Sequence, residues 1–142
     1  MAKAHAKAAV FKIHDSADSL KDLSADCDTT ELQREISTAE VTTFGATGSA
    51  RSYVPGLITA NVPIGGKWDP ASNQVDSVLS GIVAKADTVT WEYGPQGSTS
   101  GQVKYTGEGI LTSYNVSSPV DGAVTWSGNV LVSAAITRTT WA

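Results

Sequence analysis

The sequence has few of the residues that most often carry chemistry. It contains one cysteine, Cys27, and two histidines among 142 residues. A lone cysteine forms neither an internal disulfide nor a zinc site, so we interpret Cys27 as a small buried apolar residue. No apolar run approaches the roughly 18 residues of a membrane span, and residues 1–10 lack the apolar core of a secretory signal. We therefore expect no membrane partner and synthesis in a cytoplasm.

Charge is also scarce. Charged residues make up 17% of the chain, and the formal net charge is −4. This balance disfavours a basic nucleic-acid-binding surface. The abundance of Thr, Ser, Val and Gly favours β structure. The length suits one domain with its own core, and we expect residues 1–142 to form a single domain in which residues 1–7 are a flexible N-terminal arm.

No arrangement of side chains suggests catalysis. His14 and Asp15 lack a nucleophile to act on, because the segment from Gly97 to Gly101 has Thr99 at its centre and not a serine. The Gly107–Gly109 segment lacks the third glycine of a dinucleotide-binding fingerprint, so we interpret it as a bulge or a close approach of two backbones. We predict that the protein is not an enzyme and has no cofactor and no metal site.

Alternation of apolar and polar residues predicts that most of the chain forms strands. Ile58, Ala60, Val62 and Ile64 are expected to share a core-facing side of one of them. The predicted strands are residues 8–13, 29–37, 57–64, 88–93, 103–105, 110–116 and 124–136.

A single stretch has helical periodicity. Val75, Val78, Leu79, Ile82 and Val83 recur at the spacing of one helix face, which predicts a helix over about residues 72–85. The strands are separated by turns, as in hairpins. We therefore predict a mainly β fold, an antiparallel β-sandwich with this one flanking α-helix.

A Gly/Ser-rich connection over about residues 40–56 interrupts the strands. Compact domains rarely keep roughly 12–15 residues without regular structure unless the segment has a function or is disordered. Because no catalytic group stands elsewhere, we interpret this long loop as a contact site for another molecule. Its predicted contact residues are Thr43, Phe44, Arg51 and Tyr53.

A series of short phrases, in a fixed order, covers nearly the whole chain from about Ala8 onward. Together they resemble the tail tube (major tail) proteins of long, non-contractile-tailed bacteriophages. The phrases are Asp22-Leu23-Ser24, Thr42-Thr43-Phe44-Gly45, Tyr53-Val54-Pro55-Gly56-Leu57, Lys67-Trp68-Asp69, Glu92-Tyr93-Gly94-Pro95-Gln96-Gly97, Tyr105-Thr106-Gly107-Glu108, Ser117-Ser118-Pro119-Val120-Asp121-Gly122 and Thr137-Arg138.

The resemblance implies a structural protein of the virion tail, made in the cytoplasm of a host bacterium. Its copies would assemble as hexameric rings that stack into a hollow tube, with the long loop reaching the adjacent ring. The inner sheets would join into one barrel around a lumen through which double-stranded DNA passes transiently, without specific binding. The family also implies a tape measure protein and a tail terminator as partners.

Within this expectation, one strand face is a candidate lumen wall. Glu31, Gln33 and Glu35 alternate with the apolar Leu32 and Ile36, so we predict that these three polar residues face the lumen, where acidic groups repel phosphate. Arg34 falls on the apolar face, which suggests that it pairs with an acid across a subunit boundary.

Two alternatives remain open at this point. The chain could be the tube protein of a contractile tail or of a secretion or injection machine, or a β-sandwich module that binds a protein or a carbohydrate. A binding module should stay monomeric at high concentration, whereas a tube protein should form tubes visible by negative-stain microscopy.

Overall fold

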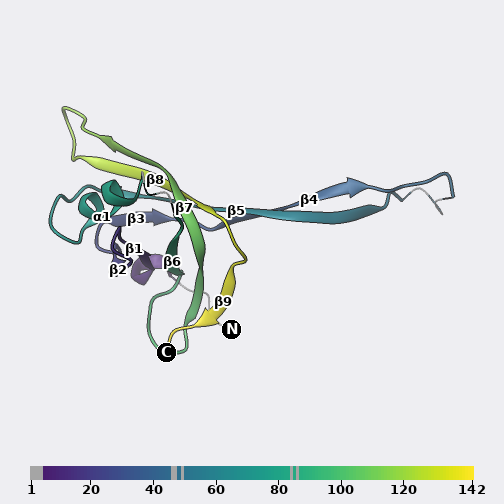
Figure 1. Cartoon of the computed structure of the whole chain (residues 1–142), viewed down its shortest axis with the longest axis horizontal. Helices are drawn as coiled ribbons and strands as arrows, with labels where there is room; N and C mark the ends of the chain where they lie inside the picture. Colours follow the sequence, from purple (N-terminus) through teal and green to yellow (C-terminus); the bar gives the residue numbers. More distant parts are fainter. Residues whose placement is uncertain (1–4, 46–47, 49, 84, 86) are drawn as a thin grey trace.

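The computed structural model describes residues 5–45, 48, 50–83, 85 and 87–142, which form a β-rich body and a long projecting hairpin (Figure 1). In this part of the chain, no helix is long and apolar enough to cross a bilayer. Ala6–Ala8 form a 3-10 turn, and residues 1–4 of the predicted flexible arm lie outside the described residues. The strands are β1 (Val10–His14), β2 (Leu20–Asp22), β3 (Cys27–Thr30), β4 (Gln33–Glu40), β5 (Tyr53–Lys67), β6 (Val89–Gly94), β7 (Val103–Ser117), β8 (Thr125–Val132) and β9 (Thr137–Thr140), and the helix is α1 (Val75–Ile82).

The strands form one antiparallel sheet in the order β2-β1-β6-β7-β8-β5-β3, with β4 paired to β5 and β9 paired to β7. The sheet curls on itself and brings β6 close to the end of β3. The Tyr93 hydroxyl in β6 donates a hydrogen bond to the Thr30 carbonyl of β3, at 3.4 Å. A bulge in β7 between Leu111 and Ser113 adds local bending. The predicted antiparallel β fold with a flanking helix is confirmed, and its two layers are parts of one curled sheet.

The core lies between the inner faces of this curled sheet and α1. Trp91 of β6 and Phe11 of β1 are its largest fully buried side chains. The Gly107–Gly109 segment crosses close to this core, since a Cβ on Gly109 would lie 2.6 Å from Cγ1 of Val130 and 3.0 Å from the backbone oxygen of Leu131. The predicted close backbone approach is therefore present. Further buried members of the core are Ile13, Leu23, Val62, Ile64, Val75, Val78, Leu79, Ile82, Val89, Leu111 and Trp126.

One predicted strand is divided in two, and another ends earlier than expected. The strand expected over residues 29–37 is interrupted between β3 and β4, opposite Pro63 of β5, which has no N–H to donate to a ladder. The Pro63 carbonyl instead accepts the N–H of Glu31 at 3.1 Å. The strand expected over residues 124–136 ends at Val132, and β9 begins only at Thr137.

Helix α1 is shorter than the predicted 72–85. A hydrogen bond to Asp26, far away in the sequence, caps its first turn. Gln74 occupies the N-cap position without a side-chain capping bond. The carboxylate of Asp26, which is only 6% exposed, accepts the N–H of Val75 at 3.0 Å. The Asp26 carbonyl accepts from the indole N–H of Trp126 at 3.2 Å and from the N–H of Lys67 at 3.0 Å. Asp26 thus joins the helix to β5 and β8.

Replacement of Asp26 separates its hydrogen bond from its buried charge. Desolvation raises the pKa of Asp26, against the opposing effect of the bond from Val75. Because the pKa of Asp26 is higher in the folded than in the unfolded protein, its contribution to the free energy of unfolding falls as pH rises from about 3.8 through the folded pKa. Asp26→Asn keeps an acceptor without the charge, so we expect its free energy of unfolding relative to wild type to increase between pH 4 and pH 7 in urea titrations. Asp26→Ala should lose about 0.5–2 kcal/mol, and a relative stability of Asp26→Asn that decreases over this pH range would contradict the assignment.

Candidate assembly interface

A two-stranded hairpin extends from the body (Figure 1). β4 pairs with the first half of β5, from Gln33 opposite Asn61 to Glu40 opposite Tyr53. β8 pairs with β5 only from Asn61 onward, and no described strand pairs with the outer edge of β4. We call residues 33–61 the arm. An unpaired strand edge is a row of free donors and acceptors, so the arm offers a template for pairing with another chain.

The long loop predicted over residues 40–56 is therefore shorter than expected. Pairing of Glu40 with Tyr53 leaves residues 41–52 as the connection between the two strands. The N–H of Val41 still donates to the carbonyl of Ser52, at 2.8 Å. Pro55 and Gly56 are typical of turns, so the sequence predicted a loop where residues 53–55 pair with β4.

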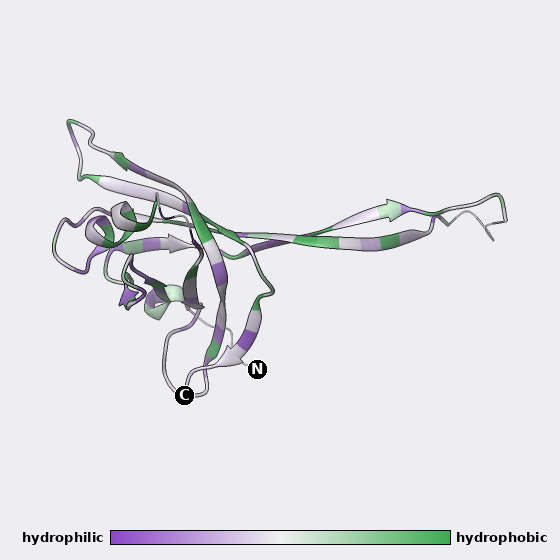
Figure 2. Cartoon of the chain, viewed as in Figure 1, coloured by the Kyte–Doolittle hydropathy of each residue, from purple (hydrophilic) through white to green (hydrophobic). Residues whose placement is uncertain are grey.

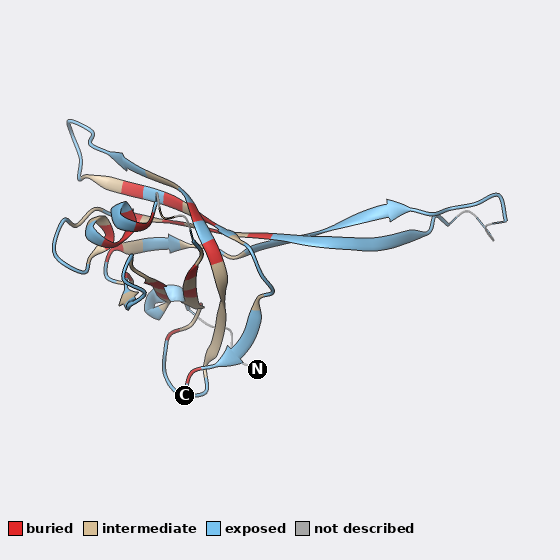
Figure 3. Ribbon diagram, in the orientation of Figure 1, coloured by how far each residue is buried: buried red, intermediate tan, exposed pale blue. Residues whose placement is uncertain are grey.

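The side chains of the arm are exposed along almost its whole length (Figure 3). Leu57 and Ile58 are 84% and 67% exposed, and the arm carries apolar stretches in Figure 2. Ile58 was expected in the core, but burial along β5 begins only at Ala60. An isolated two-stranded hairpin is marginal in water, and exposed apolar rows mark contact surfaces. The arm is thus a candidate surface for contact with another molecule.

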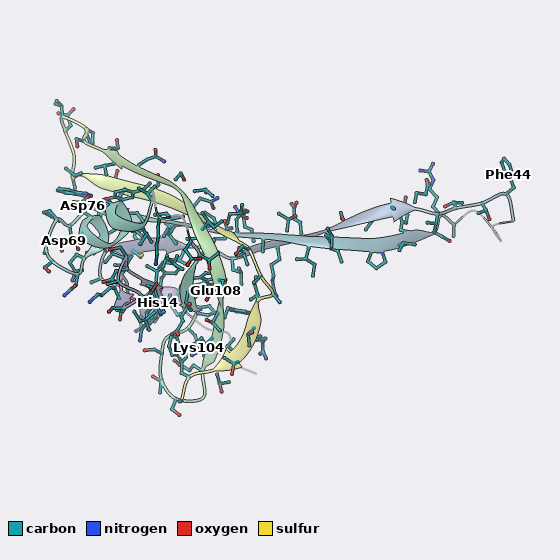
Figure 4. All side chains as sticks on the ribbon, in the orientation of Figure 1. His14, Phe44, Asp69, Asp76, Lys104 and Glu108 are labelled. Carbon is teal, nitrogen blue, oxygen red and sulfur yellow. The ribbon has the colours of Figure 1, made fainter. Side chains whose placement is uncertain are left out.

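The predicted contact residues Thr43, Phe44, Arg51 and Tyr53 gather at the far end of the arm. Phe44 points into solvent at its tip, where Figure 4 labels it. The Arg51 guanidinium lies 3.9 Å from the Glu40 carboxylate. Ala46, Thr47 and Ser49 of the same segment lie outside the described residues. The end of the arm therefore presents two exposed aromatic residues, Phe44 and Tyr53, beside the Arg51–Glu40 ion pair.

One face of the arm base is polar. Gln33 pairs with Asn61 and Glu35 with Thr59, so these four side chains share a face. The Gln33 side-chain amide donates to the Glu31 carboxylate at 2.7 Å, which brings the three residues predicted to line a lumen together. The Asn61 amide donates to Asn129 Oδ1 at 3.1 Å, so this polar face continues onto β8.

The opposite face of the arm base holds Arg34. Its guanidinium carbon lies 5.4 Å from the ring centroid of Tyr105 in β7, a cation–π contact. No carboxylate of the described residues lies within 4 Å of Arg34. An acid that neutralises Arg34 would therefore come from outside the described chain.

Two groups with reactive side chains, Glu108 and Cys27, have structural environments. Glu108 accepts hydrogen bonds from the hydroxyls of Thr88 and Thr90. Burial raises the pKa of the Cys27 thiol to about 12, so this thiol stays protonated at neutral pH. The residues that the structure describes contain no group of three or more His, Cys, Asp and Glu suited to a metal ion. The contact surface is the feature of this chain that calls for a functional explanation.

Sequence reasoning did not identify Leu57 and Ile58 as surface residues. Adjacent residues on a strand point to opposite faces, so two neighbouring apolar side chains indicate a strand covered on both faces. The adjacency of Leu57 and Ile58 is therefore the sequence signal for this surface, whereas alternation alone predicts a single inward face.

Comparisons with known proteins identify the fold and the family. The family model described as phage tail tube protein matches residues 3–138. The structure is similar to a chain in the tail of an empty gene transfer agent (GTA) particle, obtained with helical refinement and C6 symmetry, with a TM-score of 0.82 and 15% identity over 97% of this chain and 100% of that one. It is also similar to the SPP1 tail tube (0.70, 12%, covering 97% and 80%) and to a chain of the anti-feeding prophage (AFP) baseplate (0.75, 7%, covering 99% and 97%). No curated protein sequence matches.

Two residues of β5 test the division between arm and core. Leu57 is 84% exposed and Ile64 is 3% exposed. We expect Leu57→Ala to change the free energy of unfolding of the monomer by less than about 0.5 kcal/mol. Ile64→Ala should cost about 2–5 kcal/mol because it leaves a cavity. Urea titrations at low protein concentration measure both, and equal losses would show that the arm is part of the core.

Proposed function

Because this chain belongs to the phage tail tube protein family, we propose that its copies form hexameric rings that stack into the hollow tail tube of a virion. The tube conducts double-stranded DNA into the host, and the protein has no catalytic role. We assign it to the long, non-contractile type because of the ordered phrases in the sequence. The fold itself does not separate types, since it is shared with the SPP1 tail tube and with a baseplate chain.

The observation that carries this proposal is the unsupported arm. The outer edge of β4 has no partner among the described strands. The last part of β7 pairs with β8 along one edge, and no described strand pairs with its other edge. A head-to-tail contact that joins such edges removes them, and when its rotation closes it makes a ring. In a ring, the arm bases and β8 strands of six copies form a continuous barrel.

The polar face of the arm base suits the wall of that barrel. It presents Glu31, Gln33, Glu35 and Asn61, all without positive charge. Six copies at −4 carry roughly −24, so the ring repels phosphate as a whole. Weak repulsion lets DNA slide, whereas clustered arginines would hold its backbone.

The end of the arm suits the axial contact between rings. Thr43, Phe44, Arg51 and Tyr53 lie farthest from the body, and Phe44 has no cover in the described chain. Burial of Phe44 against an adjacent ring would order its side chain, which is fully exposed in the single copy. The entropy of that ordering opposes premature polymerisation.

The remaining parts of the proposal concern partners and location. A tape measure protein and a tail terminator would contact the tube in its lumen and at its end, as the family resemblance implies. The protein would be made in the bacterial cytoplasm, as a single domain spanning residues 1–142, and would then reside in the virion tail.

Replacement of Phe44 tests the axial contact. We expect Phe44→Ser to melt at the wild-type temperature, because this side chain is fully exposed in the single copy. Wild-type protein should form tubes in negative-stain micrographs, whereas Phe44→Ser should give separate rings or much shorter tubes. Wild-type protein that stays monomeric at high concentration would instead support a binding module, and normal tubes from Phe44→Ser would remove the arm tip from the contact.

A reversed charge on the polar face tests the lumen. Glu35→Lys raises the net charge of a hexameric ring by roughly twelve units on the face we assign to the lumen, because each copy loses one carboxylate and gains one ammonium group. Preformed mutant tubes should retain short double-stranded DNA at about 50 mM salt and release it as salt rises. Wild-type tubes should retain none. Asp87→Lys, at an exposed site on the body, is the matched control. Equal retention by both variants would contradict a lumen position for Glu35.

A further inference from the structure

We propose that the turn between β7 and β8 of one copy inserts into a groove at the base of the arm of a neighbouring copy, where Asp121 pairs with Arg34. This inference rests on the proposed function, for which it names a contact between copies within one ring.

The receiving site is a groove of about 580 Å³ beside the arm base. Leu57, Ile58 and Ala60 line one side, and the segment Val132–Ile136, which links β8 to β9, lines the other. Arg34 is the charged residue in its lining, and the ring of Tyr105 holds the guanidinium in place. A mostly apolar groove with one cation in its wall fits an apolar side chain that is next to a carboxylate.

The β7–β8 turn presents that pair of side chains. The N–H of Gly122 donates to the Pro119 carbonyl at 3.4 Å, so Val120 and Asp121 are the two central residues of the turn. Val120 is 100% exposed, and no described cation lies within 4 Å of the Asp121 carboxylate. Pairing of β7 with β8 continues to Ser117, so a paired ladder supports the turn. The turn therefore loses little freedom on binding.

The end of the arm is a less suitable occupant of the groove. Phe44 is apolar and exposed, but the acid nearest to it in the arm ladder, Glu40, already lies 3.9 Å from Arg51. Insertion of Phe44 would leave Arg34 without a carboxylate in a groove that excludes water. A buried charge with no partner is costly, so charge complementarity favours the β7–β8 turn.

The positions of the two surfaces require two copies. Figure 1 shows the β7–β8 turn and the arm on opposite sides of the body. The turn therefore cannot reach the groove of its own chain. Contact between two different surfaces on opposite sides of a subunit is head-to-tail, and such contacts generate rings when the rotation closes.

Exchange of the two charges tests the contact. Asp121→Arg changes an exposed turn and should leave the melting temperature unchanged, yet it should abolish rings and tubes in negative-stain micrographs. Arg34→Glu should abolish them as well. The double variant Arg34→Glu/Asp121→Arg restores opposite charges across the contact and should recover tubes. Asp87→Arg, an exposed acid elsewhere on the body, should assemble as wild type does.

The outcomes separate this inference from the proposed function. If wild-type protein forms no rings or tubes, the proposed function itself fails. If wild type and Asp121→Arg both form tubes, the proposed function stands and this contact is wrong. Chemical footprinting of Leu57 within assembled rings identifies the occupant of the groove. If Leu57 becomes exposed in Phe44→Ser but stays protected in Asp121→Arg, the arm tip occupies the groove and the inference is overturned. Loss in both single variants with recovery in the double variant supports it, and loss without recovery contradicts it.

Discussion

The structure depends on one constraint: backbone hydrogen-bonding groups and apolar side chains in a sheet need a neighbour. In the body of this protein the curled sheet and α1 supply those neighbours. Along the arm they do not, because β4 and the first half of β5 have only each other. The chain therefore has a packed body and an arm whose outer strand edge and apolar side chains stay uncovered in the single copy. Strand β5 runs through both parts.

The body gives the arm a fixed base. β5 passes from the exposed arm into the core, where Val62 and Ile64 are buried and β8 joins it. Asp26 links that stretch of β5 to the helix through the N–H of Lys67 and the N–H of Val75. An arm continuous with a packed strand has a defined direction. A defined direction would matter in the ring that we propose, because a contact that closes a ring depends on the angle between subunits.

Scarce charge has a consistent explanation in this architecture. The polar face of the arm base uses amides and carboxylates, which tolerate water and repel phosphate. Several cations of the body are held close to acids or aromatic rings, as Lys104 is by Glu92 and Trp141. Arg34 contacts the ring of Tyr105, and no carboxylate of the described residues lies within 4 Å of it. The same low charge that argued against a basic nucleic-acid-binding surface thus agrees with the DNA-conducting channel that we propose.

The sequence by itself determined the β-rich class, the helix face of Val75, Val78, Leu79 and Ile82, and the grouping of Glu31, Gln33 and Glu35, because periodicity records which side chains share a face. It also indicated the family through ordered phrases that no single position would identify. Tertiary structure alone decided that residues 53–56 pair with β4, that Pro63 divides β3 from β4, that Ile58 is exposed, and that one curled sheet replaces two. These features depend on pairings between residues far apart in the chain, and local alternation specifies a face without specifying which neighbour covers it.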